Sequence, residues 1–138
     1  MASELKHRVA KLHTDAGCCV RDYRDQRKTV QGSRELQGST VALTALADEQ
    51  RLAMFCLIAH YGALCACEIE AAFDLSHSTV IHHLNLLSEA GLLEARRSGK
   101  WSYYQLARPL PVWVQSLLAA LGQKNTQRER CCLCSIPD

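Results

Sequence analysis

The sequence predicts a mainly α-helical fold with one β-hairpin, and three observations support this. Apolar residues recur at helical spacing through residues 48–61. Two further helical segments, one beginning near Cys67 and one ending before Gly91, are joined by a turn of about three residues, DLS (residues 74–76), which is typical of a helix-turn-helix. Alternating apolar residues on both sides of the turn at residues 98–100 predict a hairpin.

Residues that begin and end helices place the first two elements. Ser39 or Thr40 is a candidate N-cap for a helix over residues 41–47. Asp48 begins a second helix, and Gly62 is well placed to end it.

The helix-turn-helix follows. Its first helix begins near Cys67 and ends by Asp74, and its second is capped by Ser76 or Ser78 and stopped by Gly91. Three apolar residues of the second helix are expected to face inward: Val80, Leu84 and Leu87.

The hairpin pairs residues 92–97 with residues 101–106, and Pro109 and Pro111 precede a last helix over residues 112–121. A helix-turn-helix followed by a basic hairpin is the winged-helix arrangement, in which a helix enters the major groove of DNA and the hairpin follows the backbone. The basic residues around the hairpin turn are Arg96, Arg97 and Lys100.

The chain is expected to comprise three parts: an arm (residues 1–38), a winged-helix domain (residues 39–123) and a flexible tail (residues 124–138). The arm is expected to contain a short helix over residues 3–13 and a basic stretch interrupted by Gly17, Gly32 and Gly38. Net charge is +3 over residues 1–40, −6 over residues 41–95 and +5 over residues 96–138. An acidic centre with basic flanks would meet nucleic acid through its flanks and through a helix without acidic residues.

Composition excludes several classes of protein. The 138 residues, 48% apolar and 22% charged, fit one compact domain with short tails. No apolar run reaches the roughly 18 residues of a membrane span, and the first residues do not form a secretory signal, so we expect a cytoplasmic protein. The sequence has no phosphate-binding loop and no nucleophilic triad spacing, so neither an enzyme nor an organic cofactor is expected.

Eight cysteines indicate metal or redox chemistry, because disulfide frameworks are rare in the cytoplasm. Residues two apart do not share a helix face, so Cys65 and Cys67 can chelate only by straddling a helix start. A helix N-terminus lowers the pKa of a thiol, and thiolates select thiophilic ions. Cys56 lies on an apolar helix face and is expected in the core.

Four segments together resemble the ArsR/SmtB family of metal-responsive winged-helix repressors, and the resemblance covers about residues 41–122. They are ALADEQR, LCACEI, LSHSTVIHHLNLLSEAGLL and RRSGKWSYYQL. The resemblance implies a homodimer, with the first and last helices of the domain at the interface. It also implies binding to double-stranded operator DNA in the apo state and release when an ion binds.

The resemblance also implies which residues contact DNA. The family's groove-facing positions correspond to His77, Ser78, Thr79, His82 and His83, and the wing adds Arg96, Arg97 and Lys100. Adjacent helix positions cannot both face the groove squarely, so one of His82 and His83 is expected to pack against the protein.

The family's arsenic motif often has a third cysteine at the position of Glu70. Some family members bring N-terminal cysteines to this motif across the dimer, so the resemblance makes Cys18 and Cys19 the best further donors. A second site or relay built from Cys131, Cys132 and Cys134 is a less favoured alternative. Three sulfurs suit As(III) or Sb(III), and four suit Cd(II), Pb(II) or Zn(II). As(III) is the first choice of inducer, and a Cd(II) or Pb(II) sensor with a four-thiolate site is the alternative.

Two other functions compete with the metal(loid)-responsive repressor. The first is a redox or reactive-sulfur sensor on the same fold. It is disfavoured because cysteines so close in sequence form strained disulfides. The second is a metal carrier with vestigial DNA binding, which the intact recognition segment and wing disfavour.

Overall fold

The computed structural model describes residue 4, residues 7–8 and residues 16–122. Two compact units divide the chain, Met1–Thr40 and Val41–Asp138. The expected helix over residues 3–13 falls mostly outside the described residues, and the expected tail over residues 124–138 falls entirely outside them.

The arm contains a longer helix than the sequence analysis expected. α2 (Ala16–Gln31) runs through Gly17, so the expected interruption there was wrong. Good helix formers (alanine, arginine, lysine and glutamine) make up much of this segment, and their propensities outweigh one glycine. The helix ends where the N–H of Gly32 donates to the Lys28 carbonyl at 2.9 Å.

α3 (Arg34–Leu46) begins earlier than expected and includes Gly38. The Ser33 hydroxyl oxygen accepts a hydrogen bond from the N–H of Leu36 at 3.1 Å, in the manner of an N-cap. The Thr40 hydroxyl instead donates to the Leu36 carbonyl at 2.8 Å, inside the helix. The expected cap at Ser39 or Thr40 was therefore wrong, because Ser33 caps the helix upstream.

α4 (Glu49–Tyr61) has the boundaries that the sequence predicted. Asp48 Oδ1 accepts from the N–H of Arg51 at 2.9 Å and caps the helix. Gly62 ends it with a φ of 87°, a conformation that glycine adopts without steric cost, and its N–H donates to the Ile58 carbonyl at 2.8 Å.

The helix-turn-helix consists of α5 (Ala66–Phe73) and α6 (His77–Glu89). Ser76, one of the two predicted caps, accepts through its hydroxyl oxygen from the N–H of Thr79 at 3.4 Å. Asp74, in the turn, has a φ of 53°. Short aspartate side chains tolerate this left-handed conformation better than most residues.

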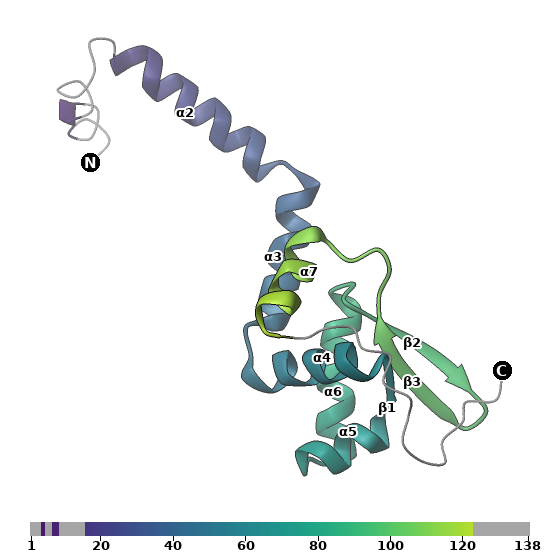
Figure 1. Cartoon of the computed structure of the whole chain (residues 1–138). Helices are drawn as coiled ribbons and strands as arrows, with labels where there is room; N and C mark the ends of the chain where they lie inside the picture. Colours follow the sequence, from purple (N-terminus) through teal and green to yellow (C-terminus); the bar gives the residue numbers. More distant parts are fainter. Residues whose placement is uncertain (1–3, 5–6, 9–15, 123–138) are drawn as a thin grey trace. The chain divides into compact units, whose positions relative to one another are not determined.

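The sheet has three antiparallel strands in the order β1-β3-β2. β2 (Leu93–Ser98) and β3 (Trp101–Leu106) form the predicted hairpin, called the wing below, and Figure 1 shows it projecting from the helices. β1 (Ala63–Cys65) was not predicted; its Leu64 lies opposite Tyr104 of β3. β1 leads directly into α5 and therefore fixes where α5 begins.

The core of the second unit gathers side chains from every helix of the winged-helix region. α7 (Val112–Ala120) adds Val114 and Leu118, while α3 adds Ala42, Ala45 and Leu46. Each fully buried large apolar side chain contributes roughly 1.5–3 kcal/mol. The fully buried set is Met54, Phe55, Ile58, Ile69, Val80, Leu84, Leu87, Leu92 and Val114.

Candidate nucleic-acid interface and thiol pair

α6 has one buried and one exposed face. Val80, Leu84 and Leu87 are buried, as predicted. The exposed face carries His77, Ser78, His82, Asn85 and Glu89. Asn85 was missed by the sequence analysis, although its spacing from Ser78 and His82 places it on the same stripe, and asparagine can pair with adenine in the major groove.

Two predicted groove-facing residues belong to the cap of α6. The Ser76 hydroxyl lies 2.8 Å from the Thr79 hydroxyl and 3.2 Å from the Ser78 hydroxyl. Ser78 is exposed, whereas Thr79 is half-buried. The cap therefore leaves Ser78 the more accessible hydroxyl of the two.

The two adjacent histidines differ in their surroundings. His82 is exposed and His83 is half-buried, with a buried Nδ1 that has no hydrogen-bond partner among the described residues. His83 is therefore the residue of the pair that packs against the protein.

Glu70 connects α5 with α6. Its carboxylate is hydrogen-bonded to Nδ1 of His77, the first residue of α6. The His77 side chain is 71% exposed and that of Glu70 is 27% exposed. The ring of His77 is thus held on one edge while most of its surface remains accessible.

The basic residues of the wing are exposed to solvent. Arg96, Arg97 and Lys100 are all exposed, and Arg97 lies opposite Ser102 in the β2–β3 pairing. Gly99 makes the tight turn with a φ of 60°. Trp101, at the tip, is 56% exposed and was not singled out from the sequence.

Cys65 and Cys67 lie together at the junction of β1 and α5, where they form a disulfide with a Cα–Cα distance of 5.5 Å. This differs from the expectation that the pair stays as thiols. The N–H of Cys65 donates to Glu68 Oε2 at 2.7 Å, which fixes the start of α5. The predicted straddling of a helix start is confirmed, because Cys65 is the N-cap residue and Cys67 lies in the first turn.

No group of three or more cysteine, histidine or acidic residues that could hold a metal ion occurs in the part of the chain that the structure describes. Cys18 and Cys19 lie in α2, and the predicted donors Cys131, Cys132 and Cys134 fall outside the described residues. The pair Cys65 and Cys67 thus supplies two neighbouring sulfur atoms, one fewer than three-coordinate As(III) takes.

Cys56 is a free, half-buried cysteine that packs against the core. Burial raises the pKa of its thiol. Because the thiolate is the form that binds ions, Cys56 is a poor ligand.

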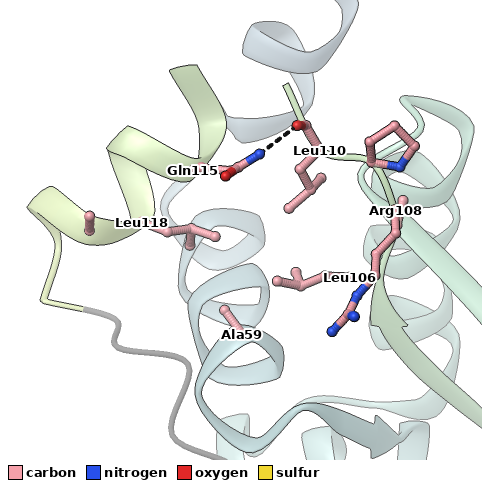
Figure 2. A pocket seen from close by; sticks show the side chains of 9 residues that line it. Ala59, Leu106, Arg108, Leu110, Gln115 and Leu118 are labelled. Carbon is pink, nitrogen blue, oxygen red and sulfur yellow. Dashed lines mark hydrogen bonds between the residues drawn. The ribbon is translucent and has the colours of Figure 1, made fainter. Parts of the chain in front are cut away.

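A cavity of about 510 Å³ lies between α4, the end of β3 with the segment after it, and α7, and no residue of α6 lines it. Figure 2 shows Arg108 and Gln115 among its mostly aliphatic lining, with Gln115 Nε2 donating to the Leu110 carbonyl at 2.8 Å. Among the described residues, no helix is both long enough and apolar enough to cross a membrane.

Comparison with known proteins gives one consistent family. The sequence pattern described as "Bacterial regulatory protein, arsR family" matches residues 48–95. The arsenic resistance transcriptional regulator ArsR1 of Pseudomonas putida is 39% identical over 94 residues, covering 68% of this chain and 73% of that protein. The arsenical resistance operon repressor of Escherichia coli is 41% identical over 73 residues, covering 53% and 62% respectively.

A solved structure from Mycobacterium bovis, the homodimeric winged helix-turn-helix DNA-binding domain of Mb0332, is 30% identical with a TM-score of 0.55. The match covers 70% of this chain and 82% of that chain. The winged-helix fold predicted from the sequence is thereby confirmed, and these relatives are regulators rather than enzymes. The chain belongs to the ArsR family of bacterial regulatory proteins.

Proposed function

We propose that this protein is a transcriptional repressor that binds operator DNA as an apo homodimer and is released when As(III) binds its cysteine thiolates. The observation that carries the proposal is the position of Cys65 and Cys67. Their two sulfur atoms lie together at the start of α5, the helix that leads into α6, which we propose as the recognition helix.

The surface for DNA consists of the exposed face of α6 and the wing. His77, Ser78, His82 and Asn85 provide hydrogen-bonding groups for base edges, and Arg96, Arg97 and Lys100 provide positive charge for phosphates. Among the described residues, α6 carries only one acidic side chain, Glu89 at its last position, so little charge opposes DNA along the helix.

The proposed inducer site uses the reduced cysteine pair. Each As–S bond forms as a thiol displaces one hydroxyl group of arsenous acid, which leaves as water with the thiol proton. As(III) takes three sulfurs, so Cys65 and Cys67 need one more, for which we propose Cys18 or Cys19. The arsenic resistance regulators among the relatives support this choice of ion.

The proposed route from ion to DNA is short. Only Asp74, Leu75 and Ser76 separate α5 from α6, so a displacement of the α5 start reaches the recognition helix through a tight turn. A homodimer must hold its two recognition helices about one DNA turn apart. Allosteric coupling of about 1–3 kcal/mol weakens operator binding roughly 5- to 150-fold, which is enough for release.

The first experiment measures binding to a near-palindromic operator by gel shift in a reducing buffer, with and without As(III). The wild-type protein is expected to release the operator. Replacing both cysteines, Cys65→Ser and Cys67→Ser, keeps operator affinity and abolishes the As(III) response. Replacing both Cys18 and Cys19 by serine is expected to weaken As(III) binding and to change the affinity for operator DNA less.

Two further variants test where the ion binds. Cys56→Ser is the matched control, since a core thiol with a raised pKa takes no part in ion binding, and it should respond like the wild type. Deletion of residues 128–138 should leave release intact. The proposed site is contradicted if As(III) still releases the operator from the Cys65/Cys67 double variant but no longer releases it from the tail deletion.

The disulfide between Cys65 and Cys67 favours one second candidate, a redox sensor on the same surface. Oxidation of the two thiols would form the bond and release two protons, with the two electrons passing to a peroxide. A gel shift of the pre-reduced protein with peroxide, in a buffer without reductant, separates the candidates. Release by peroxide, without release by As(III) in the reducing buffer, would favour the redox function.

A further inference from the structure

The hydrogen bond between Glu70 and His77 lies outside the roles assigned above. Glu70 stands where the arsenic-type motif would have a third thiol, and its carboxylate holds Nδ1 of His77. His77 is the first residue of the recognition helix. The N-terminal residues of such a helix are the ones that contact base edges.

The electrostatics of the helix start explain why this contact forms. The first turn of α6 contains no acidic residue, although the N-terminus of a helix carries partial positive charge. Glu70 supplies a negative charge from the neighbouring helix. Its side chain is 27% exposed, so the carboxylate is partly shielded from water and more dependent on this partner.

A carboxylate can only accept hydrogen bonds, so the nitrogen that it contacts must be the donor. In neutral His77 the proton therefore sits on Nδ1, and Nε2 is left as an acceptor. Without Glu70 either ring nitrogen can carry the proton, and the exposed edge can donate or accept.

We propose that Glu70 is a specificity-determining positioning residue, which fixes the tautomer of His77 and so the kind of base that His77 reads. This inference rests on the proposed DNA-binding function. With Nε2 as an acceptor, the partner in the major groove is an amino group, that of adenine N6 or cytosine N4. Guanine and thymine present only acceptors on their major-groove polar atoms and are disfavoured at that position.

The test selects bound sequences from a randomised duplex pool at pH 8.5, where histidine side chains are ordinarily neutral. His77→Ala identifies the base pair that His77 contacts, because the base preference at that position of the DNA site is lost in this variant. Glu70→Ala is expected to reduce the preference for adenine or cytosine at the same position by about 2- to 10-fold, the worth of one hydrogen bond. The base preference at the other positions of the DNA site is expected to stay as in the wild-type protein.

Glu49→Ala is the matched control. It removes one exposed carboxylate from the start of α4, outside α6 and the wing, with the same change in net charge, and should leave the selected sequence unchanged. A purely structural role of Glu70 would lower affinity for all sequences equally, without a change in preference. That outcome overturns the proposal, as does a His77→Ala variant that selects the wild-type sequence.

The tautomer itself is measured by nitrogen NMR of the histidine rings in the free protein at pH 8.5. Wild-type His77 is expected to show a protonated Nδ1 and an unprotonated Nε2, and Glu70→Ala should shift the proton toward Nε2. An identical His77 spectrum in both proteins overturns the proposal. If the wild-type protein selects no sequence at all, the DNA-binding function fails, whatever the NMR result.

Discussion

At the residue scale, single polar side chains decide where α4, α5 and α6 begin. Asp48 caps α4, the Glu68 carboxylate accepts from the N–H of Cys65 at the start of α5, and Ser76 caps α6. Each satisfies a backbone N–H that has no partner within its helix. Two of these three contacts border the proposed site, so the capping residues also determine where Cys65 and His77 lie.

Asp48 gives a prediction about pH. The hydrogen bond from the Arg51 N–H, aided by the charges of Arg51 and His83, lowers the pKa of the Asp48 carboxyl in the folded state. A carboxyl with a lowered folded pKa stabilises the protein above its unfolded pKa of about 3.9, and this contribution is lost as pH falls through the folded value. Asp48→Asn keeps a capping oxygen and removes the titration.

Urea unfolding between pH 2.5 and pH 7 measures this effect. The stability advantage of the wild-type protein over Asp48→Asn should be full near neutral pH and should shrink below about pH 4. Glu89→Gln, which removes a carboxylate at the end of α6, is the comparison variant. A difference between wild type and Asp48→Asn that stays constant with pH contradicts the prediction.

The sequence predicted some of these residue-level features and missed others. His83 lies three residues after Val80 and four before Leu87, so helical spacing alone already places it beside the buried stripe. The contact between Glu70 and His77 could not be predicted in this way. It depends on the turn at Asp74, whose left-handed backbone sets the angle between α5 and α6.

At the element scale, local patterns predicted the helices with capping signals and failed where distant contacts decide the structure. α4 and α6 carry clear caps and apolar faces, and their ends were predicted. β1 has three residues and no alternation, and it is a strand because β3 pairs with it from about forty positions along the chain. α2 has few apolar residues and a strongly hydrophilic composition, so the spacing of core-facing residues did not predict its length.

The wing gives a prediction for one element. Arg97 and Lys100 are exposed at and beside the turn, where they can neutralise phosphates. Replacing either by alanine should weaken binding to all duplexes similarly and reduce the slope of log affinity against log salt by about 0.9 for each phosphate that is no longer neutralised. Fluorescence anisotropy with a labelled duplex, at several salt concentrations, gives this slope.

Arg108→Ala is the control for the wing. It removes an equal charge from an exposed residue after β3, beside the cavity and outside the wing, and should leave the slope unchanged. An unchanged slope for both Arg97→Ala and Lys100→Ala would remove the wing from the DNA interface.

At the scale of the whole molecule, apolar side chains remain uncovered on the helices that begin and end the winged-helix region. Val41 and Leu43 of α3 are 53% and 54% exposed, Val112 at the start of α7 is 78% exposed, and Leu121 just after α7 is 44% exposed. A domain of this size does not usually leave such residues on two helices in water. We therefore propose that both helices form the dimer interface.

Val112→Asp tests this interface without harming the fold. Val112 is mostly exposed, and an acidic residue in the first turn of α7 interacts favourably with the helix dipole, so the monomer should fold as before. In a twofold symmetric dimer each variant interface would bury two carboxylates, one from each protomer, without partners. The dimer dissociation constant is expected to rise at least about 100-fold.

Light scattering after size exclusion measures the change in mass, and circular dichroism checks the helix content. Ala71→Asp, on an exposed position of α5, introduces the same charge outside α3 and α7 and should leave the dimer intact. A monomer presents only one recognition helix. Val112→Asp should therefore bind a palindromic operator more weakly than the wild type does. It should bind a single half-site with the same affinity as the wild type. A Val112→Asp protein that stays dimeric at low micromolar concentration would place the interface elsewhere.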